Sequence, residues 1–77
     1  MPKIVAIHWR RFEKFLLLYI GCTLDRQEGD HRVYYKKGAK RSLVVPMYRP
    51  LPVFIIKNNL HTLEMEHNEY LKILKKL

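Results

Sequence analysis

His31 is the side chain of this 77-residue chain best suited to acid–base chemistry near neutral pH. It lies in the stretch RQEGDHRVYYKKG, after Gly29 and Asp30 and before Arg32. An imidazole titrates close to neutral pH, so it can accept or donate a proton during a reaction. Six basic residues of the same stretch and the segment after it could hold an anionic group beside this histidine: Arg26, Arg32, Lys36, Lys37, Lys40 and Arg41.

The uneven distribution of charge indicates a polyanionic partner. Fifteen Lys and Arg residues against seven Asp and Glu residues give a net charge of +8. The six basic residues of positions 26–41 are accompanied by only two acids, whereas positions 61–70 hold three glutamates and no Lys or Arg. A basic face on a small protein is typical of nucleic-acid binding. The alternative is a solvated surface that only keeps the chain in solution.

RNA offers a reaction that these residue types can carry out. Its 2′-hydroxyl is a built-in nucleophile. Cleavage needs a base for that proton, an acid for the leaving oxygen, and positive charge for the transition state. His31 could be the base or the acid, with Asp30 or a water completing the site. The alternative for His31 is a residue at the start of a strand that is hydrogen-bonded to a turn.

The hydrophobic pattern predicts one helix, three strands and two further helices. Apolar side chains repeat at helical spacing from Trp9 to Ile20, and Gly21 ends this first helix. Strands at about 23–28, 31–36 and 41–46 are close enough in sequence to form an antiparallel meander.

Two helices complete the predicted order. Pro52 fits the first turn of a short helix whose apolar residues 53–56 are expected to be buried against the sheet. The last helix is expected at about 66–76, with lysines in its final turns. Ten side chains are expected to form one core between sheet and helices: Trp9, Phe12, Leu16, Tyr19, Leu43, Val45, Phe54, Ile55, Leu71 and Leu74.

Length and composition limit the class of protein. Seventy-seven residues make one small domain, which we expect to span 1–77. Cys22 is the single cysteine, and with four scattered histidines it makes no zinc pattern, so no metal or other cofactor is expected. A reducing compartment, the cytoplasm, fits this usage. The N-terminal MPKIVAIHWRR has an apolar stretch too short for a signal peptide or a membrane span, and the longest apolar run, 15–20, is also too short to span, so no membrane partner is expected.

The motifs and their order resemble the HicA family of small bacterial toxins. The matching stretches are FEKFLLLYIGCTLDRQEGDH, LVVP, PVFIIKNNL and EYLKIL, which together cover about 12–74. In that family an aliphatic helix ends in glycine, a strand ends in R-Q-x-G-S-H, and a third strand ends in V-P. The resemblance implies an α+β, double-stranded-RNA-binding-like fold of order α-β-β-β-α-α, with a three-stranded antiparallel sheet and helices on one face.

The same resemblance implies a function. HicA-like chains are toxins of type II toxin–antitoxin modules that cleave mRNA without a metal, and the family's functional histidine corresponds to His31. The implied partners are mRNA or other single-stranded RNA and a HicB-like antitoxin. A non-catalytic RNA-binding module with a decayed site is the alternative, and a domain that docks an acidic protein is a weaker one.

Three positions depart from the family pattern. Asp30 replaces the commoner serine, Tyr48 stands where many members carry a histidine, and Glu66 stands where a Ser or Thr often caps the last helix. A carboxylate at position 30 would favour the protonated form of His31 and would repel phosphate. Either it orients the imidazole or it weakens the activity, and both interpretations stay open at this point.

The remaining polar and aromatic candidates have simpler interpretations. His8 is expected to cap the first helix or lie on the surface, and His61 and His67 are expected to be solvated. Cys22 is expected to pack as a small hydrophobic residue. Three tyrosines could stack on bases but are more typical of half-buried packing in a small sheet: Tyr34, Tyr35 and Tyr48.

Overall fold

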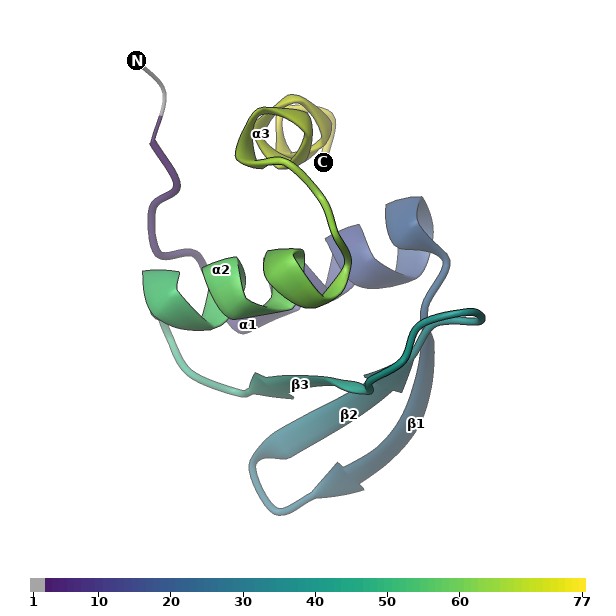
Figure 1. The fold of residues 1–77 in the computed structure, drawn as a ribbon. Coiled ribbons are helices and arrows are strands. Elements are labelled where there is room, and N and C mark those ends of the chain that lie inside the picture. The colour runs from purple at the N-terminus through teal and green to yellow at the C-terminus, as the bar shows by residue number, and fades with distance from the viewer. Residues whose placement is uncertain (1–2) are drawn as a thin grey trace.

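A helix, three strands and two further helices follow one another in the computed structural model, which describes residues 3–77 (Figure 1). Helix α1 (Trp9–Lys14) continues into the π-helical segment η1 (Phe15–Ile20). The strands are β1 (Thr23–Glu28), β2 (His31–Tyr35) and β3 (Leu43–Pro46), and the last helices are α2 (Val53–Thr62) and α3 (His67–Leu74). This order confirms the predicted α+β fold, and the element ends differ from the prediction by one or two residues.

The three strands form one antiparallel sheet in the order β1-β2-β3. Helices α1 and α2 lie over one face of this sheet, and α3 packs on α2 and η1 on the side away from the strands (Figure 1). Within residues 3–77, no helix covers the opposite face, which we call the open face. None of the helices in this described part is long and apolar enough to cross a membrane.

Strand β2 directs alternate side chains to the two faces of the sheet, as strands do. The Arg32 and Tyr34 side chains both reach Glu13 of α1, so they point toward the helices. His31 and Val33 therefore point to the open face. Since Glu28 and Pro46 pair directly with His31 in the neighbouring strands, they flank it on that face.

The segment η1 corrects the predicted face of the first helix. The N–H of Gly21 donates to the carbonyl of Leu16, five residues back, which is the wider turn of a π-helix. This turn brings Phe15 and Leu16 into the core and leaves Tyr19 43% exposed, so the prediction that Tyr19 belongs to the core was wrong. Gly21 ends the helix as predicted, in the left-handed conformation with φ 84°.

The core lies between the sheet and the helices, but α2 contributes different residues from those predicted. Phe54 is 65% exposed, because α2 turns Ile56 and Leu60 inward and places Phe54 on its outer side. Ile55 and Leu71 are partly buried. Apart from Tyr19, the other predicted core residues are buried. So are six residues that the prediction had not included: Phe15, Tyr34, Leu51, Ile56, Leu60 and Tyr70.

Candidate active site and nucleic-acid interface

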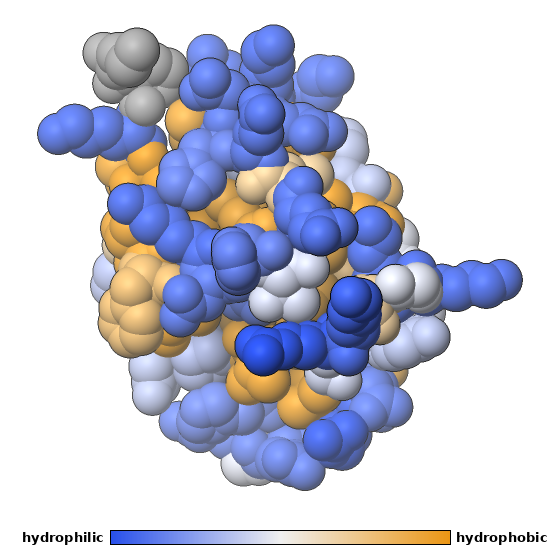
Figure 2. Space-filling model, viewed as in Figure 1, coloured by the Kyte–Doolittle hydropathy of each residue, from blue (hydrophilic) through white to orange (hydrophobic). Residues whose placement is uncertain are grey.

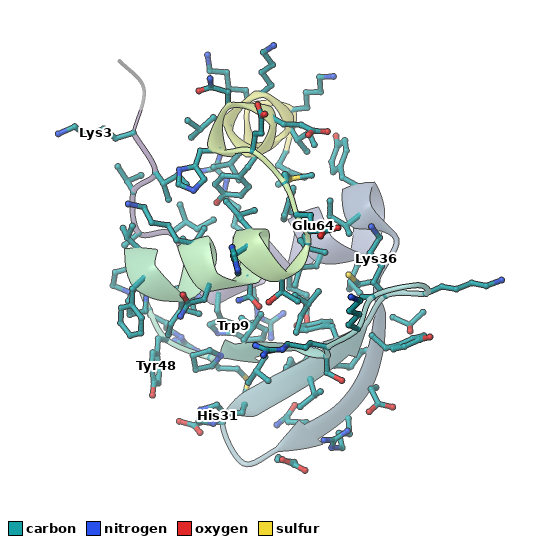
Figure 3. All side chains as sticks on the ribbon, in the orientation of Figure 1. Lys3, Trp9, His31, Lys36, Tyr48 and Glu64 are labelled. Carbon is teal, nitrogen blue, oxygen red and sulfur yellow. The ribbon has the colours of Figure 1, made fainter. Side chains whose placement is uncertain are left out.

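His31 stands at the first position of β2, directly after a tight turn. Gly29 has φ 60°, a left-handed conformation that glycine adopts without strain, and this allows the chain to reverse between β1 and β2. The His31 side chain is 45% exposed. The turn thus presents the imidazole to solvent at the end of the sheet (Figure 3).

Asp30 holds one nitrogen of the His31 ring. The distance between Nδ1 of His31 and Oδ1 of Asp30 is 2.7 Å. A carboxylate can only accept hydrogen bonds, so Nδ1 carries the proton and donates it. In the neutral ring this leaves Nε2 with a lone pair that can accept a proton from another group.

A groove runs along the edge of the sheet from His31. It has a volume of about 420 Å³ and lies between β3 and α2, and we call it the β3–α2 groove. His31, Pro46 and Tyr48 line it near the end of β3, and Arg41 lines it near the start of that strand. A smaller hollow of about 280 Å³ adjoins it, and Arg41 lines both.

Aromatic and aliphatic side chains make up much of the groove surface. The Tyr48 ring meets the His31 ring edge-on, with centroids 6.5 Å apart and an interplanar angle of 71° (Figure 3). Tyr48 and Val44 are each 43% exposed and Phe54 is 65% exposed. Figure 2 shows hydrophobic surface over the region of β3 and at the start of α2, between hydrophilic side chains.

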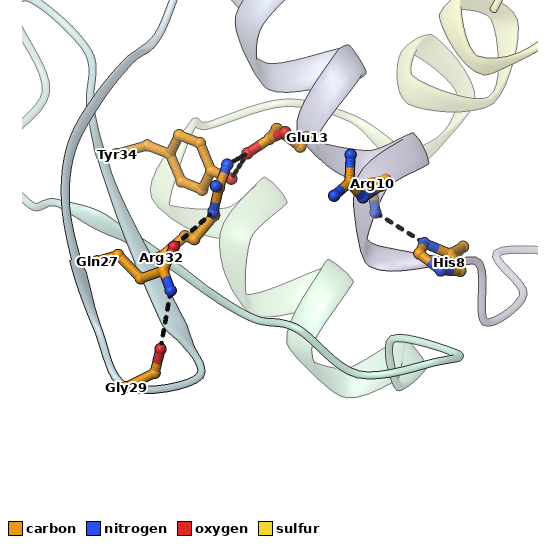
Figure 4. Close-up of polar contacts among 7 residues, drawn as sticks. All are labelled: His8, Arg10, Glu13, Gln27, Gly29, Arg32 and Tyr34. Atoms are coloured by element: carbon orange, nitrogen blue, oxygen red, sulfur yellow. Dashed lines mark hydrogen bonds and ion pairs between the residues drawn. The ribbon is translucent and has the colours of Figure 1, made fainter.

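Arg32 lies apart from this groove, on the face of the sheet that is covered by helices. Its guanidinium pairs with the Glu13 carboxylate at 2.5 Å and donates to Gln27 (Figure 4). It also lies 5.2 Å from the centre of the Trp9 ring. The hydrogen bond that Arg32 donates to Glu13 is the main reason that the pKa of Arg32 is raised. Arg32 therefore joins β2 to α1.

The other basic residues of the stretch occupy two separate places. Arg26 is on the open face but pairs with Glu28 at 2.9 Å and with Asp25 at 2.5 Å, and the hydrogen bond to Glu28 raises its pKa most. The connection between β2 and β3, at the end of β2 away from His31, carries the rest: Lys36, Lys37, Lys40 and Arg41. The six residues thus do not form one basic surface around His31.

A comparison with known protein families identifies the family to which this chain belongs. The model of the family described as the HicA toxin of bacterial toxin–antitoxin matches residues 9–65. This chain belongs to the HicA toxin family. Membership makes it a toxin of a bacterial toxin–antitoxin module and implies a cognate antitoxin as its partner. Searches of curated proteins and of solved structures found no match to the chain.

The HicA match spans all of the groove described above, from α1 to the loop after α2. Sequence alone did not place Phe54 or Tyr48 beside His31. Phe54 was expected in the core. Tyr48 was noted as a departure from the family's histidine and as a tyrosine that could stack on bases but is more typical of half-buried packing. A signal for Tyr48 was present, because it follows the V-P motif by two positions and the end of β3 pairs with His31.

The other candidate residues of this HicA chain cap a helix, are buried, or lie on the surface. His8 caps α1 as predicted, since its Nδ1 accepts the N–H of Arg10 at 3.1 Å (Figure 4). Tyr34 is fully buried, so it cannot stack on a base. Cys22 is buried, which raises the pKa of its thiol. His61 and His67 are exposed. Residues 3–77 contain no group of three His, Cys, Asp or Glu side chains that could hold a metal ion.

Proposed function

We propose that this toxin is an endoribonuclease that cleaves mRNA or other single-stranded RNA without a metal, using His31 as its acid–base group. The observation that carries the proposal is the 2.7 Å hydrogen bond between Asp30 and His31, on an imidazole that is exposed at the end of a groove. Family membership supports RNA cleavage as the reaction.

The reaction uses the nitrogen that Asp30 leaves available. Nε2 of His31 accepts the proton of an RNA 2′-hydroxyl, and that oxygen attacks the adjacent phosphorus. The bond from phosphorus to the 5′-oxygen of the next nucleotide breaks, and this oxygen takes up a proton from the imidazolium or from water. The products are a 2′,3′-cyclic phosphate and a 5′-hydroxyl.

Asp30 acts on the ring in two ways in this proposal. It fixes the tautomer with the proton on Nδ1, and its negative charge stabilises the imidazolium formed when Nε2 gains a proton. This favours the interpretation that Asp30 orients the imidazole over the one in which it only repels phosphate. Asp30 is thus proposed as a positioning residue.

The basic residues between β2 and β3 are proposed to hold the RNA backbone. Arg41 lines the groove about 17 Å from His31, taking about 3.3 Å for each of the five residue steps from Pro46, which pairs with His31, back to Arg41. It would therefore contact a different phosphate of the bound strand from the one at His31. We propose that the antitoxin is a HicB-like protein whose acidic surface covers this region and blocks the groove.

The test compares His31→Ala with His67→Ala, a matched control that removes an exposed histidine from α3. Induced expression is followed by growth and RNA integrity, and the purified proteins are assayed on RNA in EDTA. We expect His31→Ala to lose about 10²–10⁴-fold in cleavage rate and to lose toxicity. We expect His67→Ala to cleave like the wild type.

Two results would count against this function. Full cleavage by a folded His31→Ala protein would remove the histidine from the chemistry. RNA binding by the wild type without any cleavage would favour the non-catalytic RNA-binding module instead.

A further inference from the structure

The aromatic side chains of the β3–α2 groove are exposed in a way that ordinary packing does not explain. Phe54 is 65% exposed in the first turn of α2, and Tyr48 and Val44 are each 43% exposed beside the same groove. Neighbouring exposed apolar side chains of this kind mark binding sites. We propose that Tyr48 and Phe54 form a nucleobase-binding subsite for the RNA strand whose reacting phosphate lies at His31. This inference rests on the proposed function and deepens it.

The chemistry of the groove suits a base more than another apolar ligand. An aromatic ring stacks on any nucleobase through its π-face. Asn58, on the exposed side of α2, adds an amide that can both donate to and accept from a base edge. At the far end of the groove, Arg41 can pair with a phosphate of the same strand.

The charges around the groove also fit RNA. None of the lining side chains from residues 3–77 is an Asp or Glu. The acid nearest to His31 along the chain, Asp30, is already hydrogen-bonded to that ring. A polyanionic strand therefore meets little repulsion from the groove lining of a chain with net charge +8.

The edge of β3 argues against a peptide strand as the occupant. The side-chain amide of Asn59 donates to the backbone carbonyl of Val44 at 3.3 Å. An added strand on this edge would have to displace that bond in order to pair with Val44. The groove thus favours a ligand that uses side chains and stacking.

Tyr48 has a defined position relative to the reacting group. Its ring centre is 6.5 Å from that of His31, and the two rings meet edge-on. A base stacked on Tyr48 therefore belongs to a nucleotide next to the cleaved bond. Tyr48 becomes a specificity-determining residue, and purines, which stack over a larger area than pyrimidines, are the preferred bases at this position.

The experiment measures binding without cleavage. The probes are fluorescent 12-nucleotide oligo(A) and oligo(U), fully 2′-O-methylated so that the nucleophile is blocked. Affinities are measured by anisotropy at one fixed salt concentration for the full chain carrying Tyr48→Ala, Phe54→Ala or Tyr48→Trp. Tyr35→Ala is the matched control, because Tyr35 is a 48% exposed tyrosine at the other end of β2.

We expect Tyr48→Ala and Phe54→Ala each to weaken oligo(A) binding about 5- to 100-fold and to reduce the preference for oligo(A) over oligo(U). Tyr48→Trp should retain the affinity, and Tyr35→Ala should change it less than about twofold. Circular dichroism confirms that each variant is folded before its affinity is measured.

Several outcomes would overturn the subsite. These are wild-type affinity in both alanine variants, a loss in Tyr35→Ala as large as theirs, or no binding of either probe by the wild type. Unchanged RNA affinity combined with weaker binding of the cognate antitoxin would show a protein-docking surface instead. The cleavage test of His31→Ala is independent of these affinities, because the probes carry no nucleophile and their binding is measured without cleavage. A failure of that test therefore bears on the proposed function alone.

Discussion

At the scale of single residues, Asp30 is the departure from the family pattern that the structure connects most directly to the candidate chemistry. Its carboxylate accepts the Nδ1 proton of His31 at 2.7 Å. A hydrogen bond to a charged group contributes about 1.5–3 kcal/mol, and exposure of this pair places it at the lower end. We expect Asp30→Ala to lower the cleavage rate constant about tenfold with little change in KM.

Asp30→Ser restores the commoner family residue and separates the two interpretations of this position. If the carboxylate orients the ring, Asp30→Ser cleaves RNA more slowly than the wild type in single-turnover assays. A faster Asp30→Ser protein would instead show that the carboxylate hinders phosphate binding.

Tyr70 provides a second test at this scale, on stability. Its hydroxyl is buried, has no hydrogen-bond partner among residues 3–77, and has a pKa raised by burial from near 10 to about 12. Because the folded state holds this proton more tightly, the stability that Tyr70 contributes is complete below pH 10 and is lost as pH rises from 10 to 12.

We therefore expect Tyr70→Phe to flatten the fall in the free energy of unfolding between pH 10 and 12. At pH 7 it should leave stability unchanged or raise it by up to about 1 kcal/mol, since a buried hydroxyl without a partner is removed. Urea unfolding at several pH values measures this, with Tyr35→Phe as an exposed control. An unchanged slope would contradict the assignment of the alkaline transition to Tyr70.

At the scale of elements, Glu13 connects α1 to β2. Its carboxylate accepts hydrogen bonds from the Arg32 guanidinium and the Tyr34 hydroxyl, and it is only 15% exposed (Figure 4). Glu13→Ala leaves both donors without this partner, so we expect a loss of about 2–3 kcal/mol in the free energy of unfolding. Urea denaturation measures it, and Lys14→Ala, on the exposed side of α1, should change stability by less than about 0.5 kcal/mol.

A double-mutant cycle checks that the loss comes from this contact. Glu13→Ala and Tyr34→Phe should be non-additive, because they remove the same hydrogen bond. Additive effects would show that Glu13 acts through another interaction.

The elements also show what could be predicted from the sequence. The order of the strands and the two faces of β2 could be predicted from the sequence. The alternation of side chains along a strand and the glycines at the turns are local features, so neighbouring residues are enough to reveal them. Tyr19 and Phe54 were misplaced, because a π-turn and the rotation of α2 depend on packing with distant segments. Arg32 was expected to bind phosphate, but it pairs with Glu13 instead. Glu13 lies nineteen residues away, so no local spacing in the sequence indicates this ion pair.

Part of the candidate site could also be predicted from local sequence, and part of it could not. His31, Asp30 and the turn at Gly29 are neighbours in sequence, so their proximity could be predicted from the motif. The groove required the end of β3 and the first turns of α2 to meet, which only the tertiary structure defines. The family pattern pointed to position 48 as unusual, but it did not indicate that Tyr48 contacts His31.

At the scale of the whole molecule, the arrangement of charge predicts how RNA binding responds to salt. Arg26 and Arg32 are paired with acids, whereas no ion pair within residues 3–77 involves the four basic residues between β2 and β3. Each phosphate neutralised on a single strand contributes about 0.7 to the slope of log affinity against log salt. We expect Lys37→Ala, Lys40→Ala and Arg41→Ala each to lower this slope by about 0.7, as measured by titration at several salt concentrations.

Arg26→Ala is the control for this prediction, since it removes an equal charge that Asp25 and Glu28 already neutralise. Its slope should stay close to that of the wild type. An affinity of the wild type that does not depend on salt would exclude nucleic acid as the natural ligand.

The hydrogen bond from Asn59 to the Val44 carbonyl has a consequence for the toxin once it is separated from its antitoxin. Bare strand edges allow copies of a protein to join into larger aggregates. Here the edge formed by β3 has an acceptor occupied by its own helix, and the edge formed by β1 is interrupted by a bulge near Asp25. Released molecules should therefore stay dispersed, and the dose of toxin in the cell should follow the number of chains set free.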